Sequence, residues 1–564
     1  MLSTMIDQLG DFNPQLFREL KGRLKPRNLA IVSAMSMVGQ LLIYLYYESM
    51  LPHRPIYNRY SYCEYGGTAS GYECLQDAFG HILINNQLWW LDLFTCISVI
   101  GSLILIVFGS YMLINDLAKE ENRGTLGFVR FSPQSAATIL QGKMLGVPVL
   151  LFWFVLLALP LHLKAGLSAQ ISVGLIFCFY GVLLASCIFF YSAALLYALS
   201  SKGLAGFQTW LGSGLLLLFL FITTGFTISD YSITNSPLDW LRFFNPGSIL
   251  PYLVDSTYIT GDKVDYFVLG DLIKLRWYFL PLWTSFSCSI AFTLINYTVG
   301  TYWIWRGLKR RFHNPNAALV SKLQSYWLAS SFTFIVLGFA LQNQGWAEQP
   351  QGLLVNFTMV FVFNLLLFLG LIAALTPHRQ TIQDWARYRH QVSKKDRKNL
   401  FWDLLTGEKS PAIAAIAINL VITSVIILGG IIVSPLGEYK EAILWGVIFN
   451  LGFVLICAAI AQLMLFIQAQ KRVIWTTAAV LGFIILPLVS FGVTKTLPEA
   501  MPSIWILSAV PTVALEHATI TTIAWSLMGQ WLAISVASGV IVRQIRQAGA
   551  SETKILLDNK TPVI

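Results

Sequence analysis

The stretch INDLAKEENRGTLGFVRFSPQSAATILQGK (residues 114–143) is a polar island between two strongly apolar segments. It carries acidic and basic side chains, a Gly interrupts it, and a Ser-Pro pair follows that Gly. Charged side chains are costly inside a hydrocarbon core of ~30 Å, so the island is expected to lie outside a bilayer. Its two flanks are then expected to be membrane helices that the island joins.

The composition of the whole chain agrees with this interpretation. The 564 residues are 56% hydrophobic and 12% charged, whereas soluble domains carry about 25% charged residues. Apolar runs long enough to cross a bilayer as helices recur along the chain. We predict an all-α polytopic membrane protein with about twelve spans. They lie near 28–47, 88–114, 144–163, 171–198, 205–226, 278–303, 325–343, 353–376, 412–434, 441–467, 474–494 and 518–542.

The distribution of basic residues predicts the orientation of the chain. With a cytoplasmic N-terminus, 29 of the 38 Lys and Arg residues fall on the inner side and 9 on the outer side. This positive-inside pattern predicts that both termini are cytoplasmic. It also accounts for most of the net charge of +10, so nucleic-acid binding is not needed to explain that charge. The opening residues lack a short apolar segment followed by a small-residue cleavage site, so no removed signal peptide is expected.

Two of the seven cysteines stand apart from the rest. Five lie inside predicted spans as isolated residues, which is typical of small apolar filling, and no metal site is expected. Cys63 and Cys74 both fall in the first predicted outer loop. In an oxidising compartment they can form a disulfide, although two free thiols remain the alternative.

Paired short motifs indicate an internal repeat. Asn13-Pro14 precedes the first span and Asn314-Pro315 the seventh, and Ser132-Pro133 precedes the third span and Ser410-Pro411 the ninth. NPGSIL (residues 245–250) and VPTVAL (residues 510–515) follow the fifth and eleventh spans. The pairs keep one order, which favours a duplicated six-helix unit whose copies face the same way.

The residues of the island predict a helical elbow. Residues 115–123 continue the second span as a helix, and Gly124 can end that helix in a left-handed conformation. Ser132 can cap the next helix with Pro133 in its first turn. Between them, TLGFVRF (residues 125–131) forms a short amphipathic piece with an apolar face that includes Leu126 and Phe131. An ordinary solvated loop is the alternative.

The first residues predict a second cytoplasmic feature. In NPQLFRELKGRLKPR (residues 13–27), Asn13 can cap a helix and Pro14 can start it. Leu16, Phe17, Leu20 and Leu24 fall on one side, whereas the basic residues Arg18, Lys21, Arg23 and Lys25 largely face away. This pattern is typical of an interfacial helix on the inner leaflet.

These segments resemble a known family. The run KEENRGTLGFVRFSPQSAATILQGKMLGVP (residues 119–148) is similar to the cytoplasmic loop of ABC-2 type transporter permeases, and NPQLFREL (residues 13–20) to the interfacial helix of that family. The resemblance covers residues 12–300; the second half is linked to it only through the repeat. Its loop DWARYRHQVSKKDRKNLFWDLLTGEKSPA (residues 384–412) is longer and lacks the RGTL turn.

The resemblance implies a transmembrane permease subunit of an ATP-binding cassette transporter, made of two tandem six-helix ABC-2-type units. Expected boundaries are 1–27 (interfacial helix), 28–305 (first unit), 306–324 (linker), 325–542 (second unit) and 543–564 (cytoplasmic tail). Export across a bacterial inner membrane is the expected activity; the substrate cannot be named from the sequence. An apolar, aromatic-rich pathway suits a lipid-like substrate, but aromatic residues are equally normal at membrane interfaces.

The energy for transport is expected to come from a partner. The chain has no G-x-x-x-x-G-K-[ST] phosphate loop, since the nearest segment, LQGKML (residues 140–145), lacks its first Gly and its hydroxyl residue. The chain itself is therefore not expected to be an enzyme or to bind a cofactor. ATP and Mg are expected on a cytoplasmic ATP-binding subunit, in two copies, and membrane lipids are the other expected partners.

That subunit is expected to dock on the two cytoplasmic loops. The residues predicted to couple it to the first half are Glu120, Glu121, Arg123, Gly124, Thr125, Leu126, Phe131, Ser132 and Pro133. In the second half they are Leu404, Leu405, Ser410 and Pro411.

Other classes of membrane protein fit the sequence less well. An ion-coupled carrier can also have six plus six helices, but such carriers keep ionisable groups near the middle of the membrane. Here Asp92, Asp116, Glu441 and Glu516 fall at predicted span ends. Amides such as Asn364 and Asn419 occupy the centres, where interhelical hydrogen bonding is their expected role. An integral membrane enzyme lacks support, because no nucleophile and base fall close together in the sequence.

The basic-residue asymmetry generates a test of orientation. After reduction, Cys63 and Cys74 should react with a membrane-impermeant thiol reagent added from outside sealed cells. The measurement is mass spectrometry of the labelled peptides, with cells lysed before labelling as the control. Labelling only after lysis contradicts the predicted topology.

Overall fold

The chain forms two compact units. The computed structural model describes residues 13–52, 58–65, 72–79, 81–201, 207–228, 235–259, 264–315, 317–342, 348–376, 379–391, 399–467 and 472–549. Unit 1 comprises Met1–Thr234, Trp240–Leu275 and Pro281–Pro315, and unit 2 comprises Asn235–Asp239, Arg276–Leu280 and Asn316–Ile564. The last break, after Pro315, falls inside the predicted linker 306–324.

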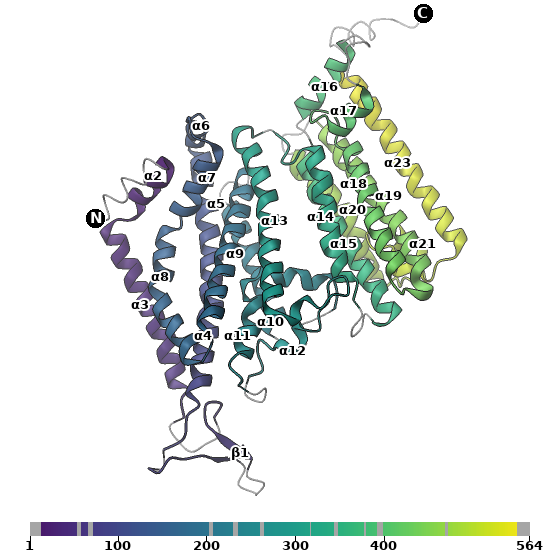
Figure 1. The fold of residues 1–564 in the computed structure, drawn as a ribbon. Helices are drawn as coiled ribbons and strands as arrows, with labels where there is room; N and C mark the ends of the chain where they lie inside the picture. Colours follow the sequence, from purple (N-terminus) through teal and green to yellow (C-terminus); the bar gives the residue numbers. More distant parts are fainter. Residues whose placement is uncertain are drawn as a thin grey trace, which may run out of the picture. The chain divides into compact units, whose positions relative to one another are not determined.

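The first half of the chain is a helical bundle with short irregular segments at its ends (Figure 1). Its elements in chain order are α2 (Pro14–Arg23), α3 (Pro26–Ser49), β1 (Cys63–Tyr65), β2 (Tyr72–Cys74), α4 (Asn86–Leu103), the π-helical turn η1 (Ile104–Phe108), α5 (Gly109–Asn122), α6 (Thr125–Arg130), α7 (Ala136–Gly146), α8 (Val149–Ser168), α9 (Val173–Ser200), α10 (Phe207–Ile228), η2 (Pro237–Phe244), η3 (Pro246–Ile249), α11 (Leu250–Asp255), α12 (Leu269–Leu272), η4 (Leu282–Thr284) and α13 (Phe286–His313).

The second half is also helical. Its elements are α14 (Lys322–Ala340), α15 (Pro350–Leu375), α16 (Arg379–Gln391), α17 (Leu400–Thr406), α18 (Ile413–Val433), η6 (Gly437–Tyr439), α19 (Lys440–Leu465), α20 (Arg472–Thr494), α21 (Pro502–Ile506), α22 (Thr512–Leu515) and α23 (Ile520–Gly549).

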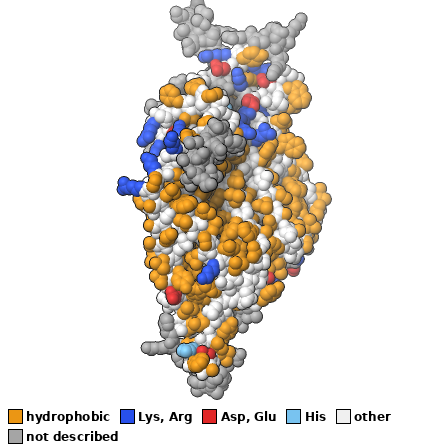
Figure 2. Space-filling model, turned by 60° about the vertical axis from the view of Figure 1, so that its left-hand side comes forward, with side chains coloured by type: hydrophobic (Ala, Val, Ile, Leu, Met, Phe, Trp, Pro, Cys, Tyr) orange, Lys and Arg blue, Asp and Glu red, His pale blue; other side chains and the backbone are white. Residues whose placement is uncertain are grey.

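The chain is a multi-pass membrane protein. Within the described residues, eleven helices are long and apolar enough to cross a membrane. The sixth predicted span, near 278–303, corresponds to the 28-residue helix α13, which is not among these eleven. Residues such as Asn296, Tyr297 and Thr298 make α13 too polar to be counted among the eleven. Hydrophobic side chains cover much of the face shown in Figure 2, while Lys and Arg side chains gather mainly nearer one end of that face.

Apart from one short hairpin between α3 and α4, the described residues form the all-α fold that was predicted. Strands β1 and β2 form an antiparallel pair, with Cys63 opposite Cys74. A disulfide joins these two cysteines. The covalent link holds together a short loop that is too small to bury a core of its own, and hairpins of this size are marginal without such support.

The two units share a pattern of helix neighbours. In unit 1, α3 packs against α4 and α8, α5 against α9, and α9 against α13. In unit 2, α14 packs against α15 and α18, α15 against α19, and α19 against α23. The short helices that follow the fifth long helix of each unit agree as well, because η3 contacts α4 and α9 while α22 contacts α15 and α19. These short helices contain the matching motifs NPGSIL and VPTVAL.

The predicted boundary at residue 305 misplaces two short segments. Asn235–Asp239 and Arg276–Leu280 belong to unit 2, although the prediction assigned both to the first unit. Gln342 Oε1 accepts a hydrogen bond from Arg276 N (3.0 Å), and Gln342 Nε2 donates to Arg276 O (2.7 Å). Tyr278 N also donates to Gly338 O (2.9 Å) in α14. Hydrogen bonds to backbone groups, as here, leave no signal in the local amino-acid composition.

The amides in the predicted spans form the hydrogen bonds expected of them. Thr333 Oγ1 of α14 donates to Asn364 Oδ1 of α15 (3.0 Å). Asn419 Nδ2 of α18 donates to Ser325 Oγ of α14 (2.8 Å). All four residues are buried. The prediction of interhelical hydrogen bonding is confirmed for these amides.

Candidate functional site

The polar island of unit 1 folds as the predicted helical elbow. Helix α5 continues the second span and ends at Asn122, and Gly124 follows with φ +70°. A left-handed residue just beyond a helix end is favourable only for glycine among common residues, so Gly124 is the predicted stop. The six-residue helix α6 then leads to α7. Two membrane helices are thereby joined by a short, ordered connection.

The predicted start of the next helix at Ser132-Pro133 is wrong. Helix α7 begins at Ala136, and Ser135 is its cap because its side chain accepts a hydrogen bond from Thr138 N (3.1 Å). Ser132 Oγ donates instead to Val129 O (2.8 Å) and so closes the end of α6. Both serines fit a capping pattern in sequence, and the turn after α6 decides which one is used.

The predicted apolar face of the elbow is also wrong in part. Leu126 is 2% exposed and belongs to the hydrophobic core of unit 1, whereas Phe131 is 91% exposed. Phe128, three residues before Phe131, is 81% exposed. The exposed apolar pair of the elbow is therefore Phe128 and Phe131. Leu126 anchors α6 to the membrane bundle.

Helix α2 docks against this elbow. Asn13 and Pro14 cap and start α2 as predicted, since Asn13 Oδ1 accepts from Leu16 N (3.0 Å). Asn13 Nδ2 also donates to Thr138 O of α7 (2.9 Å). The contact is close because two glycines of α7 face α2: a Cβ atom at Gly142 would lie 2.8 Å from Leu16 N, and one at Gly146 would lie 2.5 Å from Glu19 Cβ. The spacing of four residues puts both glycines on one face of α7.

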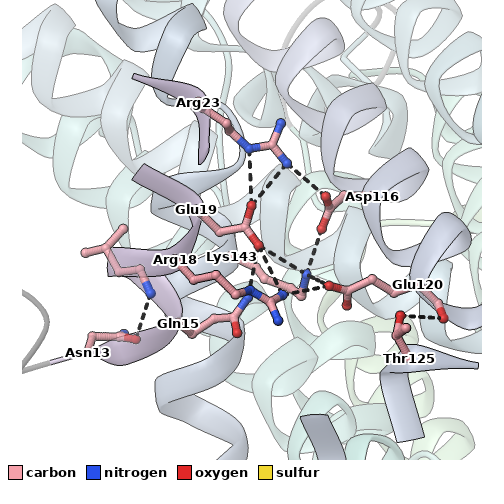
Figure 3. A network of polar contacts seen from close by, with 10 residues as sticks. Asn13, Gln15, Arg18, Glu19, Arg23, Asp116, Glu120, Thr125 and Lys143 are labelled. Carbon is pink, nitrogen blue, oxygen red and sulfur yellow. Dashed lines mark hydrogen bonds and ion pairs between the residues drawn. The ribbon is translucent and has the colours of Figure 1, made fainter. Parts of the chain in front are cut away.

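A buried lysine connects α2, α5 and α7 (Figure 3). The side chain of Lys143 in α7 is 0% exposed, and its Nζ lies 2.7 Å from Asp116 Oδ2, 2.9 Å from Glu120 Oε1 and 3.6 Å from Glu19 Oε1. A lone ammonium group is costly to bury, but three carboxylates around it offset that cost. Lys143 thus ties one residue of α2 and two residues of α5 to α7.

Two arginines complete this network and balance its charge. Arg23 NH2 lies 2.8 Å from Asp116 Oδ1 and 3.2 Å from Glu19 Oε2, and Arg18 NH2 lies 2.8 Å from Glu120 Oε1. The six side chains carry three positive and three negative charges. Glu19, Asp116 and Glu120 lie close enough together to hold a metal ion, but Lys143 Nζ already supplies positive charge among them.

The network gives several of the predicted charged residues partners within the chain. Glu120, predicted to couple to a partner subunit, pairs with Lys143 and Arg18, while Glu121 lies 3.7 Å from Arg130 NH2. Arg23 pairs with Asp116. Arg123, the third charged residue predicted to couple to the partner subunit, is exposed. Gly124 and Thr125 beside it are exposed as well.

The sequence contained a signal for this network. Gln15, Glu19 and Arg23 recur every fourth residue, which places them on one face of α2. Asp116 and Glu120 have the same spacing in α5. Two matching polar stripes on helices that meet at one end of the bundle indicate that the helices face each other, and Gln15 Nε2 indeed donates to Glu19 Oε1 (3.0 Å) in the buried stripe.

The loop of unit 2 that was predicted to be cytoplasmic is also held by a buried lysine. Lys322, the first residue of α14, is 3% exposed, and its Nζ donates to Leu404 O (2.7 Å), Ser410 Oγ (2.5 Å) and Pro411 O (3.1 Å). Ser410-Pro411 directly precedes α18, which begins at Ile413, close to the predicted start of the ninth span at 412. Ser410 Oγ lies 2.8 Å from Asp403 O, so this side chain closes the turn that follows α17.

The exposed apolar residues of α17 differ from the predicted ones. Leu404 and Leu405 are half-buried, and their carbonyl groups accept from Lys322 Nζ and Tyr326 Oη. Phe401 is 64% exposed and Trp402 is 61% exposed. The leucines therefore face the bundle of unit 2, and the aromatic pair faces outward. We call the segment of unit 2 that contains α17 the elbow of that unit. The elbow of each unit thus exposes two aromatic side chains.

The chain matches no protein-family model, no curated protein and no solved structure. Similarity to known proteins therefore assigns no family to it.

The Lys143 network generates a prediction about stability. Replacing Lys143 by Met should lower the free energy of unfolding by about 3 kcal/mol or more, because three buried or half-buried carboxylates lose their shared ammonium group. The measurement is thermal unfolding of the purified chain in detergent, together with proteolytic release of the first 25 residues.

The matched control is Lys119→Met. Lys119 is an exposed residue of α5, so its loss should change the free energy of unfolding by no more than about 0.5 kcal/mol. Equal unfolding temperatures for the two variants would show that the network does not hold α2.

Proposed function

We propose that the chain is the permease subunit of an ATP-binding cassette transporter and exports a substrate with energy from ATP hydrolysed by a separate subunit. One observation carries this proposal. The elbow of unit 1 is a short structure joined directly to α5 and α8, and it exposes Phe128 and Phe131. Two large apolar side chains held outside the membrane by a short helical connection suit a protein partner, since aromatic anchors dominate protein interfaces.

The network around Lys143 supports the coupling role of the elbow. A partner that pushes on Phe128 or Phe131 moves α6, and the ion pairs between α2, α5 and α7 pass that movement on as one body. A loosely attached loop would absorb the movement instead. Within this proposal, Lys143 and Asp116 are positioning residues and do not contact the partner.

The proposed architecture is a tandem pair of six-helix units with both termini in the cytoplasm of a bacterial cell. The shared helix neighbours of the units support the duplication, and α13 counts as the sixth helix of the first unit. We propose two ATP-binding subunits, one on each elbow. Phe401 and Trp402 of α17 are the proposed contact in unit 2, in place of the RGTL-type turn that this unit lacks.

An ion-coupled carrier is the second candidate, and one residue favours it. His162 of α8 is 4% exposed inside a membrane helix, and intramembrane ionisable residues often serve ion pathways. However, one ring nitrogen lies 2.8 Å from Ser98 Oγ and the other 2.8 Å from Tyr180 Oη. Both nitrogens are engaged with neighbouring helices, which fits a structural role, so we rank the carrier second.

The proposal predicts that the aromatic pairs hold the ATPase. Phe128→Asp with Phe131→Asp should lower the recovery of an ATP-binding cassette protein with the tagged chain at least tenfold, because each interfacial aromatic contributes on the order of 2 kcal/mol. Phe401→Asp with Trp402→Asp should lower it as well if both elbows bind. The measurement is affinity purification from native membranes, mass spectrometry of the recovered protein and its ATPase rate.

The control replaces Phe79 and Tyr258 by Asp. These side chains are 85% and 92% exposed and lie in predicted outer loops, so recovery of the ATPase should not change. The proposal fails if the unmodified chain recovers no protein with a phosphate loop, or if the Phe128/Phe131 variant recovers it undiminished while remaining folded and inserted.

A further inference from the structure

The end of helix α13 carries an exposed stripe that changes from apolar to basic. Ile295 is 62% exposed and Tyr302 is 50% exposed, and Arg306 and Lys309 are exposed further along the same face. Arg306 Nε and NH2 donate to Tyr302 Oη (3.2 and 2.9 Å), and the guanidinium group lies 5.0 Å from the centre of the Tyr302 ring. These two hydrogen bonds and the ring contact hold the Arg306 side chain along the stripe.

Helix α23 of unit 2 repeats the stripe with the same spacing. Leu532 is 66% exposed, and Arg543 and Arg546 are exposed. Eleven residues separate Leu532 from Arg543, as they separate Ile295 from Arg306, and the next basic residue follows after three more in both helices. Because eleven residues make slightly more than three full turns, the apolar and basic residues share one face. α13 and α23 also occupy matching places, against α9 and α19.

The length of the stripe matches half of a bilayer. Eleven helical residues span about 16 Å, and half of a hydrocarbon core is ~15 Å. If α13 and α23 cross the bilayer with Ile295 and Leu532 at mid-depth, the basic pair falls at the level of the lipid headgroups. Tyr302, a little deeper than Arg306, has the depth typical of interfacial aromatic residues.

The four basic side chains have no acidic partner among the residues that the structure describes. Arg306, Lys309, Arg543 and Arg546 form no ion pair with an Asp or Glu side chain there. Cations at a helix C-terminus interact favourably with the helix dipole, which explains positive charge there in general. The dipole does not account for the shared spacing from an exposed apolar residue.

We propose that each unit binds the headgroup of an anionic phospholipid at this position. Arg306 and Lys309 hold one phosphate in unit 1, and Arg543 and Arg546 hold the other in unit 2. The acyl chains then lie along the apolar part of the stripe, beside Ile295 or Leu532. This assignment does not depend on the proposed transport function.

The test measures lipid-dependent stability of the full chain in a neutral detergent. Dioleoyl phosphatidylglycerol should raise the unfolding temperature more than dioleoyl phosphatidylcholine does, with native mass spectrometry detecting up to two tightly held anionic lipids. Arg306→Gln with Lys309→Gln should remove one of them, weakening that site by roughly 30-fold at about 1 kcal/mol per basic residue. Adding Arg543→Gln and Arg546→Gln should remove the second.

Two controls distinguish this site from general attraction. Lys440→Gln with Lys495→Gln removes the same two charges from exposed positions at the opposite helix ends and should leave both bound lipids in place. Glycerol 3-phosphate, which has the phosphate without acyl chains, should not raise the unfolding temperature. Equal effects of the two lipids, equal loss in the Lys440/Lys495 variant, or full protection by glycerol 3-phosphate would each overturn the proposal.

Discussion

A backbone N–H or C=O group left unpaired in hydrocarbon costs several kcal/mol, and the long helices of this chain are the way in which that cost is avoided. Inside the helices the backbone N–H and C=O groups hydrogen-bond to one another. The remaining polar side chains pair with those of neighbouring helices, as Thr333 does with Asn364. Charged residues are driven to the helix ends, where water is near. The parts of the molecule that can receive a partner are therefore at these ends, and the elbows are among them.

Each unit secures its elbow with one buried lysine, but the chemistry differs. Lys143 is surrounded by carboxylates, so its charge is compensated by opposite charge. Lys322 meets two carbonyl groups and a hydroxyl group, which are neutral acceptors. An ammonium group at neutral acceptors fixes backbone positions, as a cap does, whereas ion pairs join separate helices. Unit 1 thereby includes α2 in its elbow, and unit 2 folds its longer loop back onto α14.

Much of the fold could be predicted from local sequence, and the site only in part. Length and apolarity locate the membrane helices. Gly124 marks the end of α5 and Asn13-Pro14 the start of α2, through backbone preferences that act within a few residues. The helix start at Ser132 was misplaced because Ser135, three residues later, is a competing cap. The burial of Leu126 depends on helices distant in sequence, so an amphipathic pattern of six residues could not separate it from Phe131. The spacing of the carboxylates in α2 and α5 indicated that these helices face each other, but it did not indicate that Lys143 of α7 lies between them.

The close approach of α2 to α7 also constrains the order in which the chain is assembled. Glu19 and Lys143 are 124 residues apart in sequence (143 − 19), yet their side chains meet. At a synthesis rate of about 5–20 residues per second, α2 leaves the ribosome roughly 6–25 s before its lysine does. During that interval the first membrane helices enter the bilayer with α2 unattached and its carboxylate in water. Helix α2 is thus made well before α7 and can take its final place only after α7 has been made.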